Sequence, residues 1–389
     1  MTSPAIRFAG FTDDWEERKL GDLVEVSSAS RVHKHEWTTS GVPFFRSSDV
    51  VSAFKGVANE RAFISQKLFE ELATRSGKVQ EGDVLITGGG SIGIPYKVPS
   101  NAPLYFKDAD LLWLKQSGKL DGDFLYTFFT APIFRTYVKS ISHIGTIAHY
   151  TIEQVKETPI LLPQIVEQSK IGTLFFNLER LITLHQREHD KSVNIKKALL
   201  EKMFPKDGEN KPEMRFAGFT DAWESRKIGD LCCEFRSGEF IKASDISPSG
   251  DYPVYGGNGL RGYASFYNHD GDFALIGRQG ALCGNMQFSC GKAYFTEHAV
   301  AVMANNSNDT LFLYYLLETM NLGQYSGQSA QPGLAVGKLN ALESRVPVKA
   351  EQEKISEFFT NLDRLITLHK RELTKLQNIK KALLEKMFV

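Results

Sequence analysis

The sequence predicts an α+β protein with two globular domains separated by an antiparallel coiled coil of two helices, arranged as an internal pseudo-twofold repeat. Three observations predict this fold class. A short frame and a long helical frame each occur twice, the inserts between them are dissimilar, and each helical frame carries an apolar stripe long enough for a coiled coil.

Bulk composition is that of an ordinary soluble protein. The chain has 389 residues, of which 42% are hydrophobic and 24% are charged. No apolar stretch reaches about 18 residues and no signal-like segment opens the sequence, so we expect a cytoplasmic protein with no membrane association. The cysteines have no zinc-ligand spacing, and we expect reduced thiols at Cys232, Cys233, Cys283 and Cys290.

The two frames are nearly identical in both copies. The short frame reads RFAGFTDDWEERKLGDL at 7–23 and RFAGFTDAWESRKIGDL at 215–231, with 14 of 17 positions identical. The helical frame reads NLERLITLHQREHDKSVNIKKALLEKMF at 177–204 and NLDRLITLHKRELTKLQNIKKALLEKMF at 361–388, with 22 of 28 identical. Their offsets are 208 and 184 residues, so the first copy is 24 residues longer between frames. Constant frames around dissimilar inserts indicate one shared partner type and two different targets.

These frames divide the chain into five segments. We expect a first domain at 1–158, a helical spacer at 159–204, a linker at 205–214, a second domain at 215–344 and a second spacer at 345–389. The linker reads PKDGENKPEM, and proline, glycine and charge are typical of linkers.

Each spacer contains a long helix-periodic stretch. Apolar residues recur at spacings of three and four from Gln164 to Met203 and again after Ile355. A helix of about 36 residues would be about 54 Å long, more than one domain core needs. We expect the two helices to pair as an antiparallel coiled coil that holds the inserts apart; docking of each helix on its own domain is the alternative. His185 and His189 have an i, i+4 spacing, but the second copy lacks the second histidine, so we expect no metal site.

The inserts mix short strands, glycine-rich turns and one helical stretch, which predicts compact α+β domains. The expected strands are Val42–Arg46, Val84–Thr87, Leu111–Leu114, Phe273–Ile276 and Ala299–Met303. The expected helices are Phe124–Val138 and Leu311–Met320.

A glycine-rich run follows one predicted strand in each insert. TGGGSIG has the glycine spacing of a dinucleotide site, but Pro95 and Pro99 follow, so no helix begins there and we expect no nucleotide. In the related run GDFALIGRQGALCG, Arg278 and Gln279 replace glycines. Arginine pairs with guanine and glutamine with adenine in the major groove, so this tip is a candidate DNA-reading loop; a solvated turn is the alternative.

Other candidate DNA contacts lie on turns and at strand ends. YGGNGLRGY places Asn258 and Arg261 on a loop between Tyr255 and Tyr263, where glycines allow close approach to a phosphate. The runs QYSGQSAQ and GTIAHY precede the helical frames at equivalent positions. These two runs, the strand ends and the glycine-rich run supply further candidate DNA contacts. They are Arg46, Ser47, Ser48, Gly89, Ser91, Lys97, Thr146, His149, Tyr150, Tyr325, Gln328 and Gln331.

The charge balance tells against a DNA binder that works alone. The net charge is zero, and the segment from Cys232 to Ser344 holds six basic and ten acidic residues, a balance of −4. If this insert reads DNA, it uses a few well-placed cations and a partner supplies affinity.

Together, the RFAGFTDDWEERKLGDL frame and its twin, NIKKALLEKMF, YGGNGLRGY and IGRQGALCG resemble the specificity subunits of type I restriction-modification systems over essentially the whole chain. The resemblance implies two target recognition domains, each reading one half of a split double-stranded DNA sequence, and two helices that fix the gap. It implies that two methyltransferase (M) subunits dock on the frames and that restriction (R) subunits join them. S-adenosylmethionine, ATP and Mg are then expected in the partner subunits, with no cofactor in this chain.

The sequence contains no motif that we would expect of a catalytic chain. There is no Walker A run, no Asn-Pro-Pro-aromatic run and no paired-carboxylate nuclease motif, so we expect no catalytic residue. Two alternatives stay open. A coiled-coil adaptor that binds proteins or glycans would suit the neutral charge, and an enzyme that uses the glycine loop or the histidines would be active alone.

Overall fold

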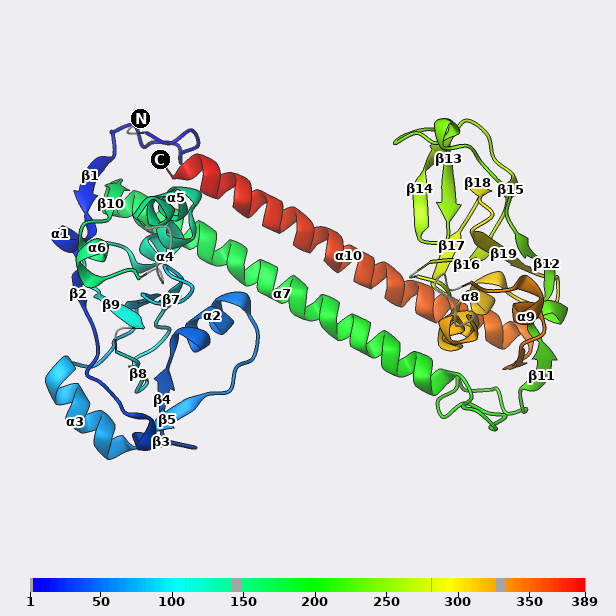
Figure 1. The fold of residues 1–389 in the computed structure, drawn as a ribbon, viewed down its shortest axis with the longest axis horizontal. Helices are drawn as coiled ribbons and strands as arrows, with labels where there is room; N and C mark the ends of the chain where they lie inside the picture. Colours follow the sequence, from blue (N-terminus) through cyan, green and yellow to red (C-terminus); the bar gives the residue numbers. More distant parts are fainter. Residues whose placement is uncertain (1–2, 109, 142–148, 281, 327–332, 389) are drawn as a thin grey trace. The chain divides into compact units, whose positions relative to one another are not determined.

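The structure, a computed structural model, describes residues 3–108, 110–141, 149–280, 282–326 and 333–388. The chain divides into two compact units: unit 1 comprises Met1–Arg187 and Lys370–Val389, and unit 2 comprises Glu188–His369. Each unit contains one short frame, one insert and parts of both long helices (Figure 1). These helices, α7 (Ile165–Met203) and α10 (Lys349–Met387), each span 39 residues and confirm the predicted pair.

The strands described in unit 1 form two four-stranded sheets and one two-stranded ribbon. The first sheet has the order β2 (Glu25–Ser27), β9 (Leu111–Lys115), β6 (Val84–Thr87) and β7 (Pro95–Lys97). The second has the order β3 (Trp37–Thr38), β5 (Ala62–Ile64), β4 (Val42–Phe45) and β8 (Tyr105–Phe106). The ribbon pairs β1 (Glu16–Lys19) with β10 (Pro159–Leu162). The shorter helices are α1 (Leu20–Leu23), η1 (Lys34–Glu36), α2 (Ser47–Lys55), α3 (Gln66–Ser76), α4 (Gly122–Thr130), α5 (Pro132–Ile141) and α6 (Ile152–Lys156).

The single helix expected at Phe124–Val138 is wrong, because α4 and α5 are separate helices. Asp121 caps the start of α4 by accepting hydrogen bonds from two backbone N–H groups. Pro132 forces the residue before it out of the helical region, and Ala131 is extended at φ −68° and ψ 148°. The break turns α5 onto a new axis, beside the loop that follows β6.

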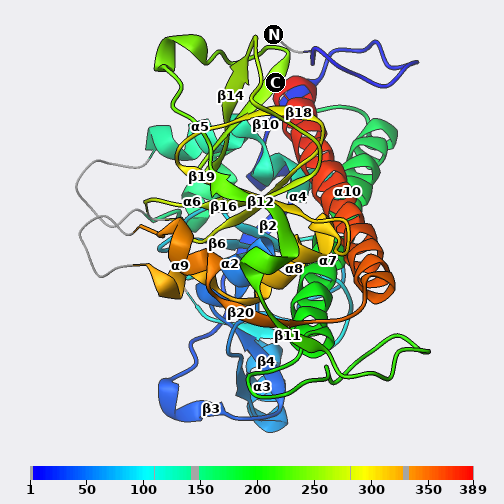
Figure 2. The same ribbon diagram turned by 90° about the vertical axis from the view of Figure 1, so that its right-hand side faces the viewer.

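In the described part of unit 2, the strands again form two four-stranded sheets and a ribbon. The first sheet has the order β12 (Cys232–Ser237), β19 (Ala299–Ala304), β16 (Phe273–Gly277) and β17 (Met286–Ser289), and Figure 2 shows the first three side by side. The second has the order β14 (Gly259–Ala264), β13 (Tyr252–Gly256), β18 (Lys292–Phe295) and β15 (His269–Asp270). The ribbon pairs β11 (Glu224–Lys227) with β20 (Glu343–Val346). The shorter helices are η2 (Ile228–Leu231), η3 (Ala243–Asp245), α8 (Thr310–Thr319), η4 (Leu322–Tyr325) and α9 (Val336–Asn340).

The two inserts share most of their strand topology although their sequences are dissimilar; the edge strands β3 of unit 1 and β15 of unit 2 have no counterpart in the other unit. The order β2-β9-β6-β7 in unit 1 corresponds to β12-β19-β16-β17 in unit 2. In each second sheet the one parallel pair also corresponds, β4 with β8 and β13 with β18. All five predicted strands, and the helix predicted at Leu311–Met320, are confirmed to within one residue at each end. The internal repeat therefore includes the inserts as well as the frames.

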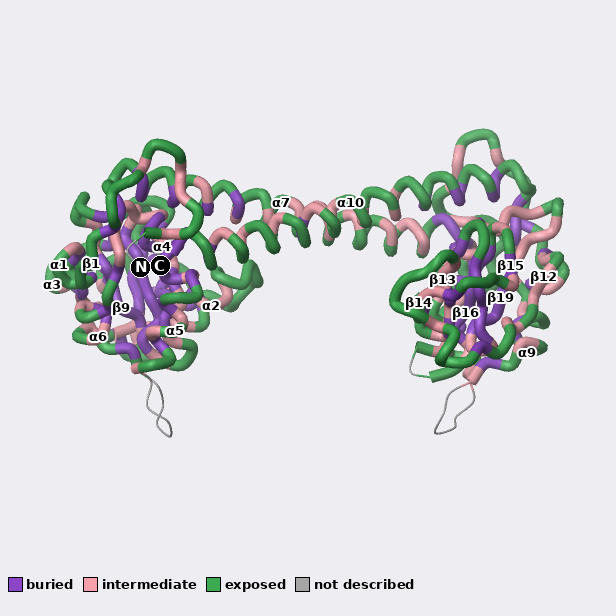
Figure 3. The backbone as a smooth tube through the Cα atoms, turned by 90° about the horizontal axis from the view of Figure 1, so that it is seen from above, coloured by how far each residue is buried: buried purple, intermediate pink, exposed green. Residues whose placement is uncertain are grey.

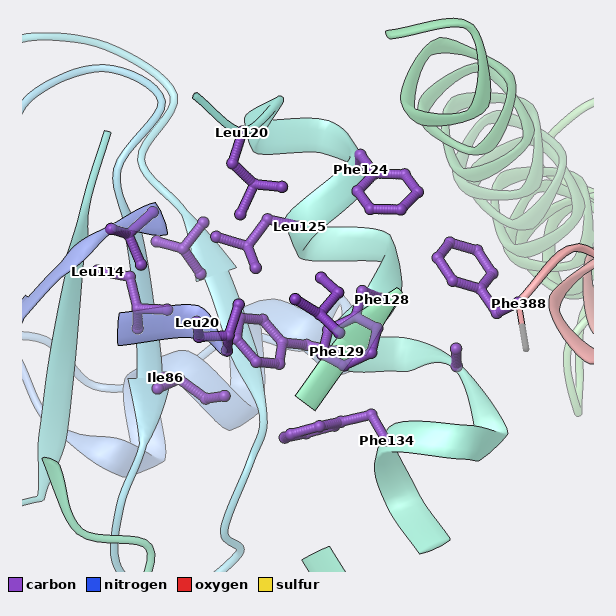
Figure 4. Packing of buried hydrophobic residues seen from close by; sticks show 14 of the residues in the cluster. Leu20, Ile86, Leu114, Leu120, Phe124, Leu125, Phe128, Phe129, Phe134 and Phe388 are labelled. Carbon is purple, nitrogen blue, oxygen red and sulfur yellow. The ribbon is translucent and has the colours of Figure 1, made fainter. Parts of the chain in front are cut away.

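The largest core of unit 1 joins the first sheet to helix α4 and to the end of α10 (Figure 4). Phe388 lies beside Phe124, with ring centroids 5.4 Å apart, and meets Trp15 of the short frame at 6.4 Å. Unit 2 repeats this cluster with Phe204, which lies 5.6 Å from Phe312 and 6.0 Å from Trp223. Each short frame therefore packs on the end of the long helix from the other copy.

The two long helices pack on each other inside each unit. In unit 1 the first part of α7 lies against the last part of α10, where Glu179 pairs with Lys380. In unit 2 the last part of α7 lies against the first part of α10, where Lys196 lies 2.9 Å from Asp363. These pairs are related by the 184-residue offset. The helices run antiparallel in both units, as the sequence predicts.

None of the helices in the described residues combines the length and apolar character needed to cross a membrane.

Candidate nucleic-acid interface

In unit 1, the loop that follows β6 is fixed by backbone hydrogen bonds to two distant segments. The Gly88 N–H donates to the Asp110 carbonyl at 2.9 Å, and the Gly88 carbonyl accepts from the Tyr150 N–H at 2.8 Å. Gly89 forms a β-bridge with His149, and the Ser47 hydroxyl donates to the Asp110 carbonyl at 3.0 Å. We call Gly88, Gly89, Asp110 and His149 platform 1.

Unit 2 repeats this arrangement with different side chains. The Arg278 N–H donates to the His298 carbonyl, and the Arg278 carbonyl accepts from the Leu334 N–H, both at 2.9 Å. Gln279 forms a β-bridge with Gly333, which lies 184 residues after His149. We call Arg278, Gln279, His298 and Gly333 platform 2. The same backbone arrangement therefore carries different residues in the two units. Gly88, Gly89, Asp110 and His149 of unit 1 correspond in that order to Arg278, Gln279, His298 and Gly333 of unit 2.

The Arg278 side chain is oriented by neutral acceptors. Its Nε donates to the Leu334 carbonyl and its Nη1 to the Ser237 hydroxyl, both at 3.1 Å. Within the described ranges, no carboxylate forms an ion pair with Arg278. A guanidinium held this way has further N–H donors for a ligand, which suits recognition of a guanine edge.

The run YGGNGLRGY forms a hairpin, so the expectation of a loop is confirmed for Asn258, which lies on the turn, and is wrong for Arg261. Strands β13 and β14 pair directly around a short turn, so Arg261 lies on β14 and Asn258 lies at the exposed tip. A Cβ atom at Gly257 would lie 3.1 Å from the His298 carbonyl and 3.3 Å from the Gln279 carbonyl. The tip therefore packs against platform 2, and the close approach suits glycine.

The basic candidates in unit 1 have carboxylate partners. Arg46 lies 2.9 Å from Asp49 and also donates to the Glu60 carbonyl. Lys97 pairs with Asp123 and lies opposite Val84, at the end of the β6–β7 hairpin far from the glycine loop. Neither side chain belongs to platform 1.

Tyr150 has a core side chain. It is 1% exposed, and this burial raises its pKa, although the hydrogen bond between its hydroxyl and Thr158 acts in the opposite direction. Its backbone supports platform 1, but its ring cannot reach a ligand. Tyr255 is half-buried against Phe295, with ring centroids 6.1 Å apart, and burial raises its pKa as well.

The remaining candidates lie near the platforms or outside the described residues. Ser48 and Ser91 are exposed, Tyr263 is half-buried on β14, and Tyr325 is 38% exposed on η4. Thr146, Gln328 and Gln331 lie outside the described residues. Sequence reasoning missed Asp110 and His298, each of which lies shortly before the central strand β9 or β19. No sequence signal marked them, because they meet the glycine-rich run only through backbone hydrogen bonds between residues far apart in the sequence.

No group of three or more potential metal ligands occurs in the ranges that the structure covers. On α7, His189 Nδ1 lies 3.1 Å from Asp190 Oδ1, and this pair is not part of such a group.

Duplicated folds with unlike side chains on one scaffold define the chain as a two-site recognition protein. A family model described as the type I restriction modification DNA specificity domain matches residues 12–193 and 220–378. The chain therefore belongs to the DNA specificity subunits of type I restriction-modification systems, which recognise DNA and are not catalytic.

Known relatives of this family match most of the chain. The EcoprrI specificity subunit of Escherichia coli is 29% identical over 357 residues, covering 89% of this chain and 86% of that protein. The MjaVIII specificity subunit of Methanocaldococcus jannaschii is 20% identical over 405 residues, covering 96% and 91%. The crystal structure of the S subunit from M. genitalium superposes with a TM-score of 0.72 at 18% identity, covering 100% of this chain and 99% of that one. The last match confirms the fold class.

Proposed function

We propose that each unit reads one half of a bipartite double-stranded DNA target, with platform 1 and platform 2 as the base-contacting surfaces. The observation that carries the proposal is the shared scaffold, on which Gly88 and Gly89 of unit 1 correspond to Arg278 and Gln279 of unit 2. A constant scaffold fixes the approach to DNA, and different side chains at its tip select different bases. Arg278 suits guanine and Gln279 suits adenine.

The long helices are the proposed spacer and the proposed docking site for two M subunits. Three exposed apolar residues recur at the same frame positions: Leu181 and Leu365, Leu184 and Leu368, and Ile195 and Ile379. Figure 3 shows exposed and half-buried residues following each other along both helices. Exposed apolar side chains that are identical in two copies suit two identical partners. R subunits would join this complex in the cytoplasm, and S-adenosylmethionine, ATP and Mg would bind the partners.

Mapping of methylated adenines tests the proposed function. A host that expresses this chain with its M subunits is expected to carry methylation at one bipartite sequence, read out by sequencing of modified DNA. As a control, exchange of Cys232–Ser344 for the insert of another family member is expected to change one half of that sequence only.

Two outcomes would contradict this proposal. Methylation without sequence preference would favour an adaptor that binds proteins or glycans. A change in both half-sites after the exchange would show that the inserts do not read separately.

Substitution of one exposed leucine tests the docking surface. Leu184→Glu is expected to lower the number of M subunits per chain from two to one, because a charge in an apolar interface loses its hydration. Leu184 is 50% exposed, so the isolated chain should keep its stability. Native mass spectrometry measures the stoichiometry, with Lys191→Glu on the same helix as the control. If the variant still binds both M subunits at full affinity, the docking surface does not include Leu184.

A further inference from the structure

Arg135 lies against the glycine-rich loop of unit 1, Gly88–Gly93. It is a partly buried residue of α5, and its Nη1 donates to the Ile92 carbonyl at 3.4 Å. Its guanidinium carbon lies 5.7 Å from the centroid of the Phe134 ring. A Cβ atom at Gly93 would lie 3.3 Å from Nη1 and 3.0 Å from that ring, and Gly93 has a φ of +73°. The glycine lets the loop close over the arginine.

Arg135 has no carboxylate partner in the part of the chain that the structure describes, and the undescribed segment 142–148 that follows α5 contains no Asp or Glu. Burial lowers the pKa of Arg135, and no acidic neighbour opposes that effect. Lys107 of the same unit, by contrast, lies 2.6 Å from the Asp110 carboxylate. A partly buried cation without an anion is costly, and the described residues give this one a hydrogen bond from Nη1 only, to the Ile92 carbonyl.

We propose that Arg135 binds a backbone phosphate of the DNA that carries the first half-site, at the Gly88–Gly93 loop. The proposal rests on the proposed function, because platform 1 belongs to the same loop. A phosphate supplies the missing anion, and its projecting oxygens can reach a guanidinium that sits behind a loop. A base edge would require the side chain to extend into a groove, whereas Arg135 packs along Phe134 and beneath Ile92. Arg135 is therefore a positioning residue, and platform 1 selects the bases.

A salt series on the complex of this chain with its M subunits tests the proposal. Arg135→Gln keeps an amide donor for the Ile92 carbonyl but removes the charge. It is expected to weaken binding about tenfold, as the loss of a charged hydrogen bond does. It should reduce the slope of log affinity against log salt by about 0.9, the value of one phosphate contact. The weakening should be equal for the cognate duplex and for duplexes altered in the first half-site. Arg135→Lys should keep most of the slope.

The controls separate the possible failures. Arg18→Gln, in the β1–β10 ribbon and paired with Glu16, should leave the slope unchanged. An unchanged slope in Arg135→Gln would overturn the phosphate contact, and a selective loss of discrimination at one base would assign Arg135 to base reading instead. If the unmodified complex binds cognate and altered half-sites equally well, the proposed function itself is wrong. Thermal unfolding of Arg135→Gln close to that of the unmodified chain excludes a folding defect.

Discussion

Replacement of Arg7 by alanine is expected to lower the free energy of unfolding of unit 1 by about 3 kcal/mol. Arg7 forks onto Glu167 at the start of α7, with Nε 2.7 Å from Oε1 and Nη2 2.8 Å from Oε2. The Glu167 side chain is 0% exposed and that of Arg7 is 11% exposed. Removal of the arginine leaves a buried carboxylate with no charged partner, which costs more than the two hydrogen bonds alone.

Chemical denaturation measured by tryptophan fluorescence checks this value. With Trp223 replaced by phenylalanine, the remaining tryptophans of the chain all lie in unit 1: Trp15, Trp37 and Trp113. Arg18→Ala is the matched control, because Arg18 and Glu16 form an exposed pair whose loss should cost under about 1 kcal/mol. An Arg7→Ala variant no less stable than Arg18→Ala would show that the buried pair does not hold the short frame to α7.

Unit 2 contains the same ion pair, which shows how much of the fold the frames encode. Arg215 forks onto Glu351, with both distances 2.7 Å and the Glu351 side chain 0% exposed. Arg7 and Arg215 occupy the same position of the short frame, which the sequence alone reveals as a repeat. Near-identity of the frames therefore predicted a pseudo-twofold fold, because identical residues make identical contacts.

The shared topology of the inserts could not be read from the sequence. Topology depends on which strands pair over long separations, and the dissimilar inserts give no alignment to compare. Local signals gave five of the insert strands correctly and missed the others, since only strongly buried strands such as β6 and β16 are clear apolar runs. Pro132 was a local signal for the break between α4 and α5, and the apolar periodicity on both sides of it concealed that break.

The candidate site was only partly visible for a related reason. Arg278 and Gln279 were accessible to sequence reasoning because their side chains suggest base recognition. Asp110 and His298 became visible only through long-range backbone hydrogen bonds. Arg135 belongs to no sequence motif, because the feature that matters is its lack of a carboxylate partner among the described residues, and that feature depends on the folded chain.

The target itself is expected to change when both long helices are lengthened. Insertion of seven residues between Arg187 and Glu188 in α7, and of seven between His369 and Lys370 in α10, should widen the gap between half-sites by about three base pairs. Seven residues add about 10.5 Å of helix, and each base pair of B-DNA occupies about 3.4 Å. The insertion turns each helix by nearly two whole turns, with a residual of about 20°, so the packed faces still meet.

The positions of the insertions follow from the contacts inside each unit. Both partners of the Glu179–Lys380 pair lie in unit 1 and both partners of the Lys196–Asp363 pair lie in unit 2, so the insertions disturb neither. The bases read by platform 1 and platform 2 should therefore stay the same, as mapping of methylated adenines would show. Insertion of four residues is the contrasting variant, since it rotates each helix by about 40° beyond a full turn and should impair methylation. An active seven-residue variant with an unchanged gap would show that the helices do not set the spacing. A spacer that is two turns longer cannot keep platform 1 and platform 2 over half-sites at the original separation.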